Sequence, residues 1–74
     1  MANRKQVEKL VGKLESLSGY SLRFTDAPVH MDRDDRWFLE DKISFRTIES
    51  FKNLEDAYWN IKSMINDREH LLAS

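Results

Sequence analysis

The 74-residue sequence predicts an α+β fold in the order α-β-β-β-α, with two helices packed on one face of a three-stranded antiparallel sheet. Apolar residues recur at three- and four-residue steps near each end of the chain, which indicates a helix at each end. The stretch between these ends alternates apolar and polar residues with period two, which is typical of half-buried strands. One proline and two glycines argue against disorder. We therefore expect a single domain over residues 1–74.

The first helix is predicted over residues 3–18. Asn3 is suited to cap its start, and Gln6 stands where the partner residue of a capping box belongs. Gly19 marks the end, because glycine tolerates the left-handed conformation that closes many helices. An apolar stripe runs between these limits and consists of Val7, Leu10, Val11, Leu14 and Leu17.

The first strand is predicted over residues 20–25, where Tyr20, Leu22 and Phe24 alternate with polar residues and face inward. Residues 26–28 are expected to form a turn, because aspartate and proline both favour one. Residues 32–35 then follow as a charged loop.

Residues 37–39 and 43–47 are predicted to form a hairpin whose loop length decides its register. A three-residue loop places Leu39 opposite Ile43 and Trp37 opposite Phe45, with Phe38 on the outer face. A two-residue loop sends Trp37 and Leu39 to solvent instead. We favour the first register because it buries more apolar area, at about 25 cal/mol per Å², although its loop has no glycine for a bulge.

The second helix is predicted from residue 53 to residue 72. Asn53 caps its start, and acidic residues in the first turn suit the helix dipole. Ile48 and Phe51 are expected to pack over that first turn. The apolar stripe of this helix consists of Leu54, Ala57, Tyr58, Ile61, Met64, Ile65 and Leu72. Both apolar stripes must be shielded from water, and the sheet formed by the segments between the two helices in the sequence supplies the surface that covers them.

The composition limits the classes of function. The chain has no cysteine, which excludes thiol nucleophiles and thiolate metal sites. It shows no signal-peptide core, and its longest apolar run, residues 37–39, is far too short to span a bilayer. We therefore expect a cytoplasmic protein without membrane contact. The initial methionine and the capped helices at both ends favour a complete small protein.

The charge of the chain is small but unevenly placed. The net charge of −1 argues against a strong nucleic-acid-attracting field around the whole molecule. Residues 1–13 hold four basic residues and one acidic residue, a net charge of +3, whereas residues 26–41 hold six acidic and two basic residues, a net charge of −4. Opposite poles of this kind let a protein select its partners electrostatically.

Three features favour binding to another protein. Trp59 lies roughly 140° from the centre of the second helical stripe, at 100° per residue, with Lys62 beside it. There it either widens the core or, if exposed, anchors an interface. The other candidate residues are Phe38 on the outer sheet face and Asp32, Asp34 and Asp35 in the acidic loop, which suits a basic partner or mimics nucleic-acid phosphate.

A nucleic-acid-binding accessory role is the alternative. Arginines around an exposed aromatic ring contact phosphates and stack bases in single-strand binders, and a line of lysines on a helix also suits phosphates. The same residues more often form an ordinary solvated surface. The candidates are Arg23, Arg36, Phe38 and Arg46 on the outer sheet face, and Lys5, Lys9 and Lys13 on the first helix.

No catalytic or nucleotide-binding motif is present in the sequence. The acidic loop departs from the calcium-loop pattern, because Trp37 stands at the position of the turn glycine and Ile43 at that of the closing glutamate. His30 with Asp32 and Asp34 is at most a loose set of metal ligands. We therefore predict no enzymatic activity, no cofactor and no metal site.

The sequence thus favours a small non-enzymatic protein-binding module that acts as an adaptor, regulator or inhibitor of a larger protein. Small stand-alone domains of this size are common among phage and mobile-element proteins that block host machinery, which suggests a similar role here. A homo-oligomeric structural piece is a further alternative, since a free strand edge or an uncovered sheet face pairs readily with a copy of itself.

Overall fold

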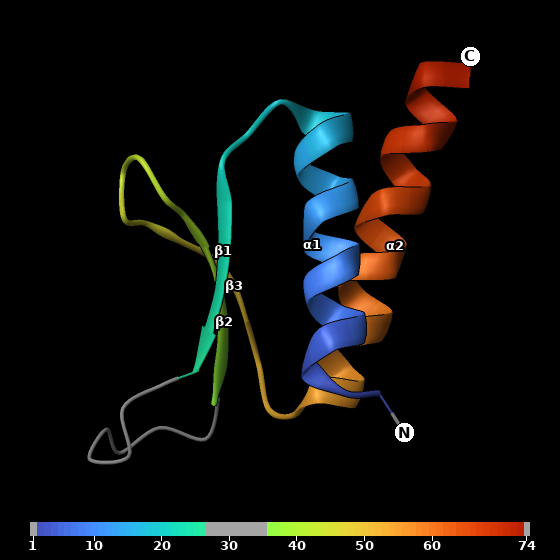
Figure 1. Cartoon of the computed structure of the whole chain (residues 1–74). Helices are drawn as coiled ribbons and strands as arrows, with labels where there is room; N and C mark the ends of the chain where they lie inside the picture. The colour runs from blue at the N-terminus through green and yellow to red at the C-terminus, as the bar shows by residue number, and fades with distance from the viewer. Residues whose placement is uncertain (1, 27–35, 74) are drawn as a thin grey trace.

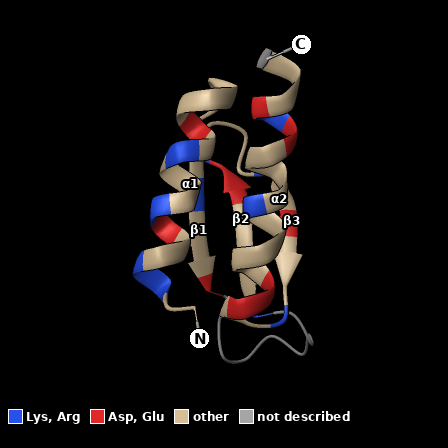
Figure 2. Ribbon diagram, turned by 90° about the vertical axis from the view of Figure 1, so that its right-hand side faces the viewer, with Lys and Arg blue, Asp and Glu red and all other residues tan. Residues whose placement is uncertain are grey.

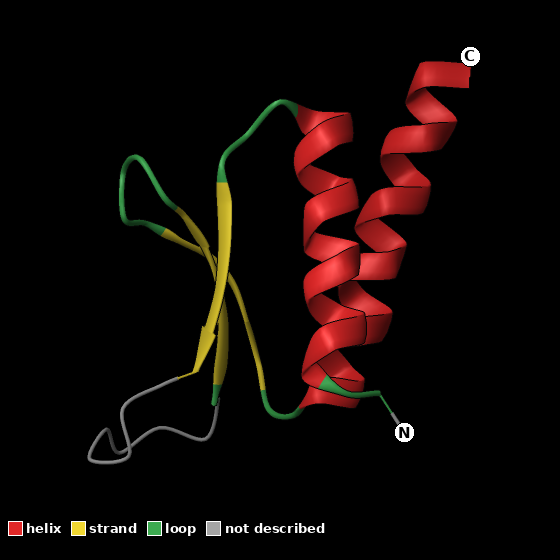
Figure 3. Ribbon diagram, in the orientation of Figure 1, coloured by secondary structure: helices red, strands yellow, loops and turns green. Residues whose placement is uncertain are grey.

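The computed structural model describes residues 2–26 and 36–73, and these residues show the predicted order of elements. The elements are α1 (Arg4–Ser18), β1 (Leu22–Asp26), β2 (Trp37–Asp41), β3 (Thr47–Phe51) and α2 (Leu54–Ala73). The two helices lie side by side on the same face of the sheet, so the molecule has a helical layer and a sheet layer (Figures 1 and 3). The predicted α+β class and the order α-β-β-β-α are therefore confirmed.

Caps at both ends of α1 and at the start of α2 lie where the sequence predicts them. The N–H of Gln6 donates to Asn3 Oδ1 at 2.9 Å, and the N–H of Asn3 donates to Gln6 Oε1 at 3.0 Å, which completes a capping box. Gly19 ends α1 with a left-handed φ of 77°. At the start of α2, Asn53 Oδ1 accepts the N–H of Asp56 at 2.7 Å.

The strands pair antiparallel in the order β1-β2-β3, so β2 is the central strand. Phe24 of β1 lies opposite Leu39 of β2, and Trp37 of β2 lies opposite Phe51 of β3. Side chains directly opposite one another share a face of the sheet, so these four residues project together toward the helices. The rings of Phe24 and Trp37 stack in parallel with their centroids 5.1 Å apart.

The predicted register of the β2–β3 hairpin is wrong. Leu39 lies opposite Glu49 rather than Ile43, and Trp37 lies opposite Phe51 rather than Phe45. The third strand therefore occupies Thr47–Phe51, whereas the sequence favours residues 43–47.

Asp41 explains the different register. Its Oδ1 accepts the N–H groups of Ile43 at 2.8 Å and Ser44 at 3.2 Å, and its carbonyl accepts the N–H of Phe45 at 2.9 Å. The N–H of Asp41 donates to the Arg46 carbonyl at 2.9 Å. These bonds curl residues 42–46 into a longer turn than the predicted three-residue loop. Phe45 takes the left-handed position in this turn, with a φ of 59°.

The core lies between the helices and the inner face of the sheet. Every described element contributes buried side chains to it: Val7, Val11, Leu14, Leu22, Phe24, Leu39, Phe51, Ala57, Ile61 and Ile65. Both predicted helical stripes thus face the core. Besides Ile43 and Phe45 of the mispredicted hairpin, two further residues predicted to lie on inward faces do not. Tyr20 is 56% exposed because β1 begins only at Leu22, and Leu72 is 68% exposed because the last turn of α2 runs past the end of α1 (Figure 1).

Candidate functional site

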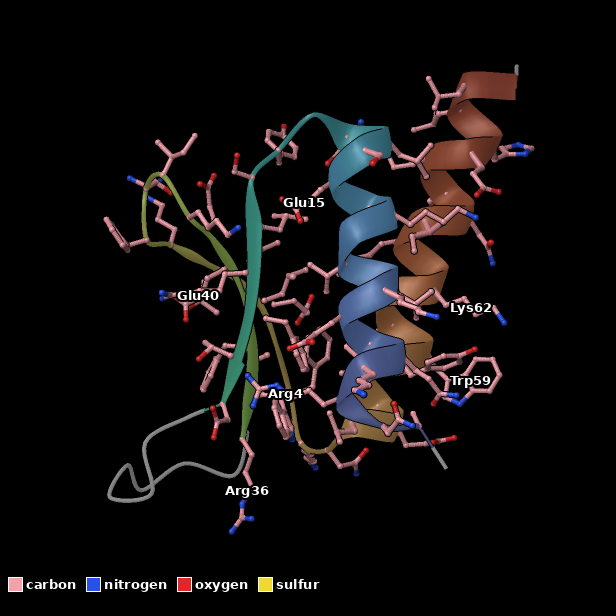
Figure 4. All side chains as sticks on the ribbon, viewed as in Figure 1. Arg4, Glu15, Arg36, Glu40, Trp59 and Lys62 are labelled. Atoms are coloured by element: carbon pink, nitrogen blue, oxygen red, sulfur yellow. The ribbon has the colours of Figure 1, made fainter. Side chains whose placement is uncertain are left out.

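Trp59 is exposed on the first half of α2, so it does not widen the core, which was one of the two interpretations that the sequence allows. The side chain is 57% exposed and points, with Lys62, away from the sheet (Figure 4). Its ring meets Tyr58 edge to face, with the centroids 5.2 Å apart. Lys62 Nζ lies 5.3 Å from the centroid of the Trp59 ring and 5.5 Å from that of the Tyr58 ring. These three residues and Glu55 form what we call the Trp59 platform.

Glu55 holds the indole of Trp59 in place. Its Oε1 accepts the indole N–H at 3.1 Å, and its Oε2 accepts the backbone N–H of Ala2 at 2.7 Å. These two donors, Ala2 first and Trp59 second, hold the pKa of Glu55 below its ordinary value. The carboxylate is therefore charged at neutral pH, and it links the indole on α2 to the backbone just before α1.

A small polar recess lies beside the Trp59 platform. It has a volume of about 180 Å³ and is lined by Ala2, Gln6, Glu55 and Tyr58. The Trp59 platform therefore presents an apolar ring and a cation within two turns of α2, beside a polar hollow that the start of α1 helps to line. This combination suits recognition of another protein surface, where tryptophan is enriched among the residues that carry binding energy.

The acidic loop lies outside the described residues, and so do its candidates Asp32, Asp34 and Asp35. The same holds for His30 and for the predicted turn at residues 27–28. Trp59 and Lys62 are therefore the predicted protein-binding residues that the structure brings together.

Phe38 is buried, so the expectation of an exposed aromatic on the outer sheet face is wrong. The sequence places it correctly on the face opposite Leu39, yet its side chain is only 8% exposed. The ring projects from the central strand, where Thr25 and Ser50 flank it from the neighbouring strands. Its faces are therefore not open for stacking against a base.

The arginines of the alternative nucleic-acid site do not form one exposed cluster around Phe38. Arg23 donates to Glu40 Oε2 at 3.1 Å, which neutralises it within the sheet. Arg46 belongs to the turn after β2, whereas Arg36 precedes the other end of that strand and points away from the sheet (Figure 4). On this face, the geometry gives little support to single-strand binding.

The predicted line of lysines on α1 is partly neutralised as well. Lys13 Nζ lies 2.9 Å from Glu69 Oε1 of α2, so it joins the two helices. Lys5 and Lys9 are exposed on α1, where basic residues recur along the helix (Figure 2). Two open lysines are a small footprint for a phosphate backbone.

Sequence reasoning missed a second surface, which we call the apolar end. Its residues are exposed large apolar side chains from the α1–β1 connection, the β2–β3 turn, the start of β3 and the last turns of α2. These segments lie at one end of the molecule (Figure 1). Among the exposed large apolar side chains that the structure describes, Trp59 alone lies elsewhere. The apolar end consists of Tyr20 (56%), Ile43 (79%), Phe45 (73%), Ile48 (48%), Leu71 (67%) and Leu72 (68%).

A groove of about 290 Å³ opens at the apolar end, between the last turns of the two helices and the sheet. Leu14, Leu39 and Met64 line its interior, and Tyr20, Ile48 and Leu71 also line it. Asp67 and Arg68 supply the charged part of its lining, with the Arg68 guanidinium 5.9 Å from the centroid of the Tyr20 ring.

The sequence feature that points to this surface is a turn-forming residue, and the period-two alternation of apolar residues misleads. Ile43 and Phe45 alternate with polar residues and so match the pattern of a buried strand. Aspartate at position 41 was the available clue, since its side chain favours turns by accepting backbone N–H groups two and three residues ahead. Ile48, predicted to pack over the first turn of α2, instead lines the groove beside the last turns of that helix.

Comparison of the chain with protein-family models, with curated proteins and with solved structures finds no match. Within residues 2–26 and 36–73, no three His, Asp or Glu side chains gather closely enough to hold a metal ion. None of the helices in this part of the chain has the length and apolar character needed to cross a membrane. The exposed surfaces are therefore the features from which a function can be argued.

Proposed function

We propose that the chain is a non-enzymatic protein-binding module that acts as an adaptor, regulator or inhibitor by covering a surface on a larger protein. The observation that carries the proposal is Trp59, a tryptophan more than half exposed yet held by a hydrogen bond to Glu55 and by the Lys62 ammonium. An exposed tryptophan offers a large apolar area to a partner. A ring that is already fixed loses little conformational entropy on binding.

The residues around Trp59 indicate the shape and charge of the partner surface that would fit it. Lys62 keeps its charge near the two rings, so an acidic group on the partner would pair with it at the rim of the contact. Glu55 has both carboxylate oxygens occupied by Ala2 and Trp59. The partner surface that fits is therefore a shallow apolar pocket for the indole, bordered by a carboxylate.

Affinity capture from the native cell tests this proposal, with mass-spectrometric identification of what is retained. The wild-type chain is compared with Trp59→Ala and with the matched control Lys9→Ala, an exposed substitution on α1. We expect one set of proteins to be retained by wild type and Lys9→Ala and lost with Trp59→Ala. Capture of nothing above background, or equal capture by all three chains, would contradict the proposal.

Titration calorimetry with the purified partner then gives the size of the effect. Trp59→Ala should weaken binding by about 2 kcal/mol or more, as expected of a central interface tryptophan. Because Trp59 lies outside the core cluster, the melting temperature should change little, which separates lost binding from lost folding.

A further inference from the structure

The β2–β3 turn holds two apolar side chains in solvent in a fixed arrangement. Ile43 is 79% exposed and Phe45 is 73% exposed, yet both N–H groups are bonded to Asp41. Phe45 also adopts a φ of 59°, which asparagine or glycine accepts more readily than a bulky aromatic residue. The exposed ring of Phe45 adds little to the folding of the single chain, so the presence of a bulky aromatic residue at this strained position suggests a role in binding.

The groove at the same end of the molecule complements this projection. It is open, about 290 Å³ in volume, and lined mainly by apolar side chains such as Leu14, Leu39 and Met64. Side chains of the size of isoleucine and phenylalanine suit such a space. The chain thus carries an apolar projection and an apolar groove at the same end of the molecule. The turn that bears the projection curls away from the helical layer, on the other side of the sheet (Figure 1).

We propose that the apolar end is a self-association surface, on which each of two copies inserts Ile43 and Phe45 into the groove of the other. Projection and groove at one end allow a two-fold axis to satisfy both at once, so that the assembly closes as a dimer. This inference uses a surface separate from the Trp59 platform and does not depend on the proposed function.

The exposed apolar area favours a second copy as the occupant. Lys42 and Arg46 flank the apolar tip of the turn and are exposed, and the charged part of the groove lining consists of Asp67 and Arg68. Docking of the turn in the groove of another copy would bring Arg46 near Asp67, which makes this pair the charged contact to test. At roughly 150–200 Å² for a large side chain, of which on average about two thirds is exposed here, the six side chains of the apolar end offer at most about 600–800 Å² per copy, close to the ~800 Å² per partner of a standard interface.

Sedimentation equilibrium of the purified full chain over a wide range of concentration tests the proposal. We expect a reversible monomer–dimer equilibrium for the wild type. Phe45→Asn introduces a residue that tolerates the left-handed φ, so it should weaken dimerisation about tenfold or more without lowering the melting temperature measured at dilutions where the chain is monomeric. Ile43→Ser provides a second variant at a fully open position. Trp59→Ala is the matched control and should dimerise like the wild type.

A charge exchange locates the contact. Arg46→Glu and Asp67→Lys should each weaken the dimer, and the double variant should restore it, because each copy then carries the reversed pair. A monomer at all concentrations would overturn the proposal, as would a dimer that tolerates both Phe45→Asn and Ile43→Ser. Failure of the double variant to restore the dimer would overturn the docking geometry. Binding of a monomer to anionic lipid vesicles through Phe45 would replace the second copy with a lipid surface.

Discussion

Truncation of Leu39 and of Ile43 should have very different effects on stability. Leu39 is fully buried in the core cluster, and Ile43 is 79% exposed. Leu39→Ala removes buried methyl groups and leaves a cavity, which costs about 2–5 kcal/mol. Ile43→Ala removes atoms that already contact water, so its cost should stay within about 0.5 kcal/mol.

The expected loss at Leu39 is large for a chain of this size. At roughly 0.05–0.15 kcal/mol per residue, a 74-residue domain has a free energy of unfolding of about 4–11 kcal/mol. Leu39→Ala therefore removes a substantial fraction of the stability and lowers the melting temperature by about 10 °C or more. In the register that the sequence favours, both side chains share the inner face and both substitutions would cost similar amounts.

Urea unfolding followed by far-ultraviolet circular dichroism measures both variants against the wild type. The chain is diluted to its monomeric range, so that loss of self-association through Ile43 does not enter the result. The slope of the free energy against urea should be unchanged, which shows that the variants unfold the same structure. Equal losses at the two positions, or a larger loss at Ile43, would refute the observed register.

Three further outcomes follow from the local geometry. Gly12→Ala should raise the free energy of unfolding by roughly 0.5–1 kcal/mol, because Gly12 is helical with open space around it. Gly19→Ala should lower the free energy of unfolding by about 1 kcal/mol, because the φ of 77° disfavours alanine. Urea unfolding measures both changes. The lowered pKa of Glu55 means that its stabilising contacts exist above pH 4.5, its ordinary value, and are lost as the pH falls through the lower folded pKa. Trp59 fluorescence in a Trp37→Phe background should report that acid transition, and Glu55→Gln should abolish it.

The helices were predictable because their signals are local. Asn3 and Gln6 are three residues apart, and the glycine at position 19 fixes the end of α1 without reference to any distant residue. The position of Trp59 on the flank of α2 also follows from helical periodicity alone. Its hydrogen bond to Glu55 joins residues one helical turn apart, a spacing that brings side chains together on a helix surface.

The hairpin register was not predictable from local periodicity. Two segments compete for the position opposite β2. Ile43 and Phe45 have the period-two spacing of one strand face, whereas Ile48 and Phe51, three residues apart, do not. The long-range pairing of Phe51 with Trp37 and the hydrogen bonds to Asp41 decide between them. A glycine would have marked the left-handed turn position, but Phe45 occupies it. The apolar end follows from this choice and was therefore missed as well.

The helical layer joins segments from opposite ends of the chain, which has a consequence for biosynthesis. Lys13 pairs with Glu69, and Ala2 donates to Glu55, so α1 finds its lateral partner only in α2. On the ribosome, α1 and the strands β1 to β3 emerge before α2, and until α2 follows, the inner sheet face beside β3 lacks the cover that this helix supplies. A nascent chain that pauses before α2 is made therefore exposes apolar surface that chaperones and proteases bind. The two-layered domain closes only after α2 has left the exit tunnel.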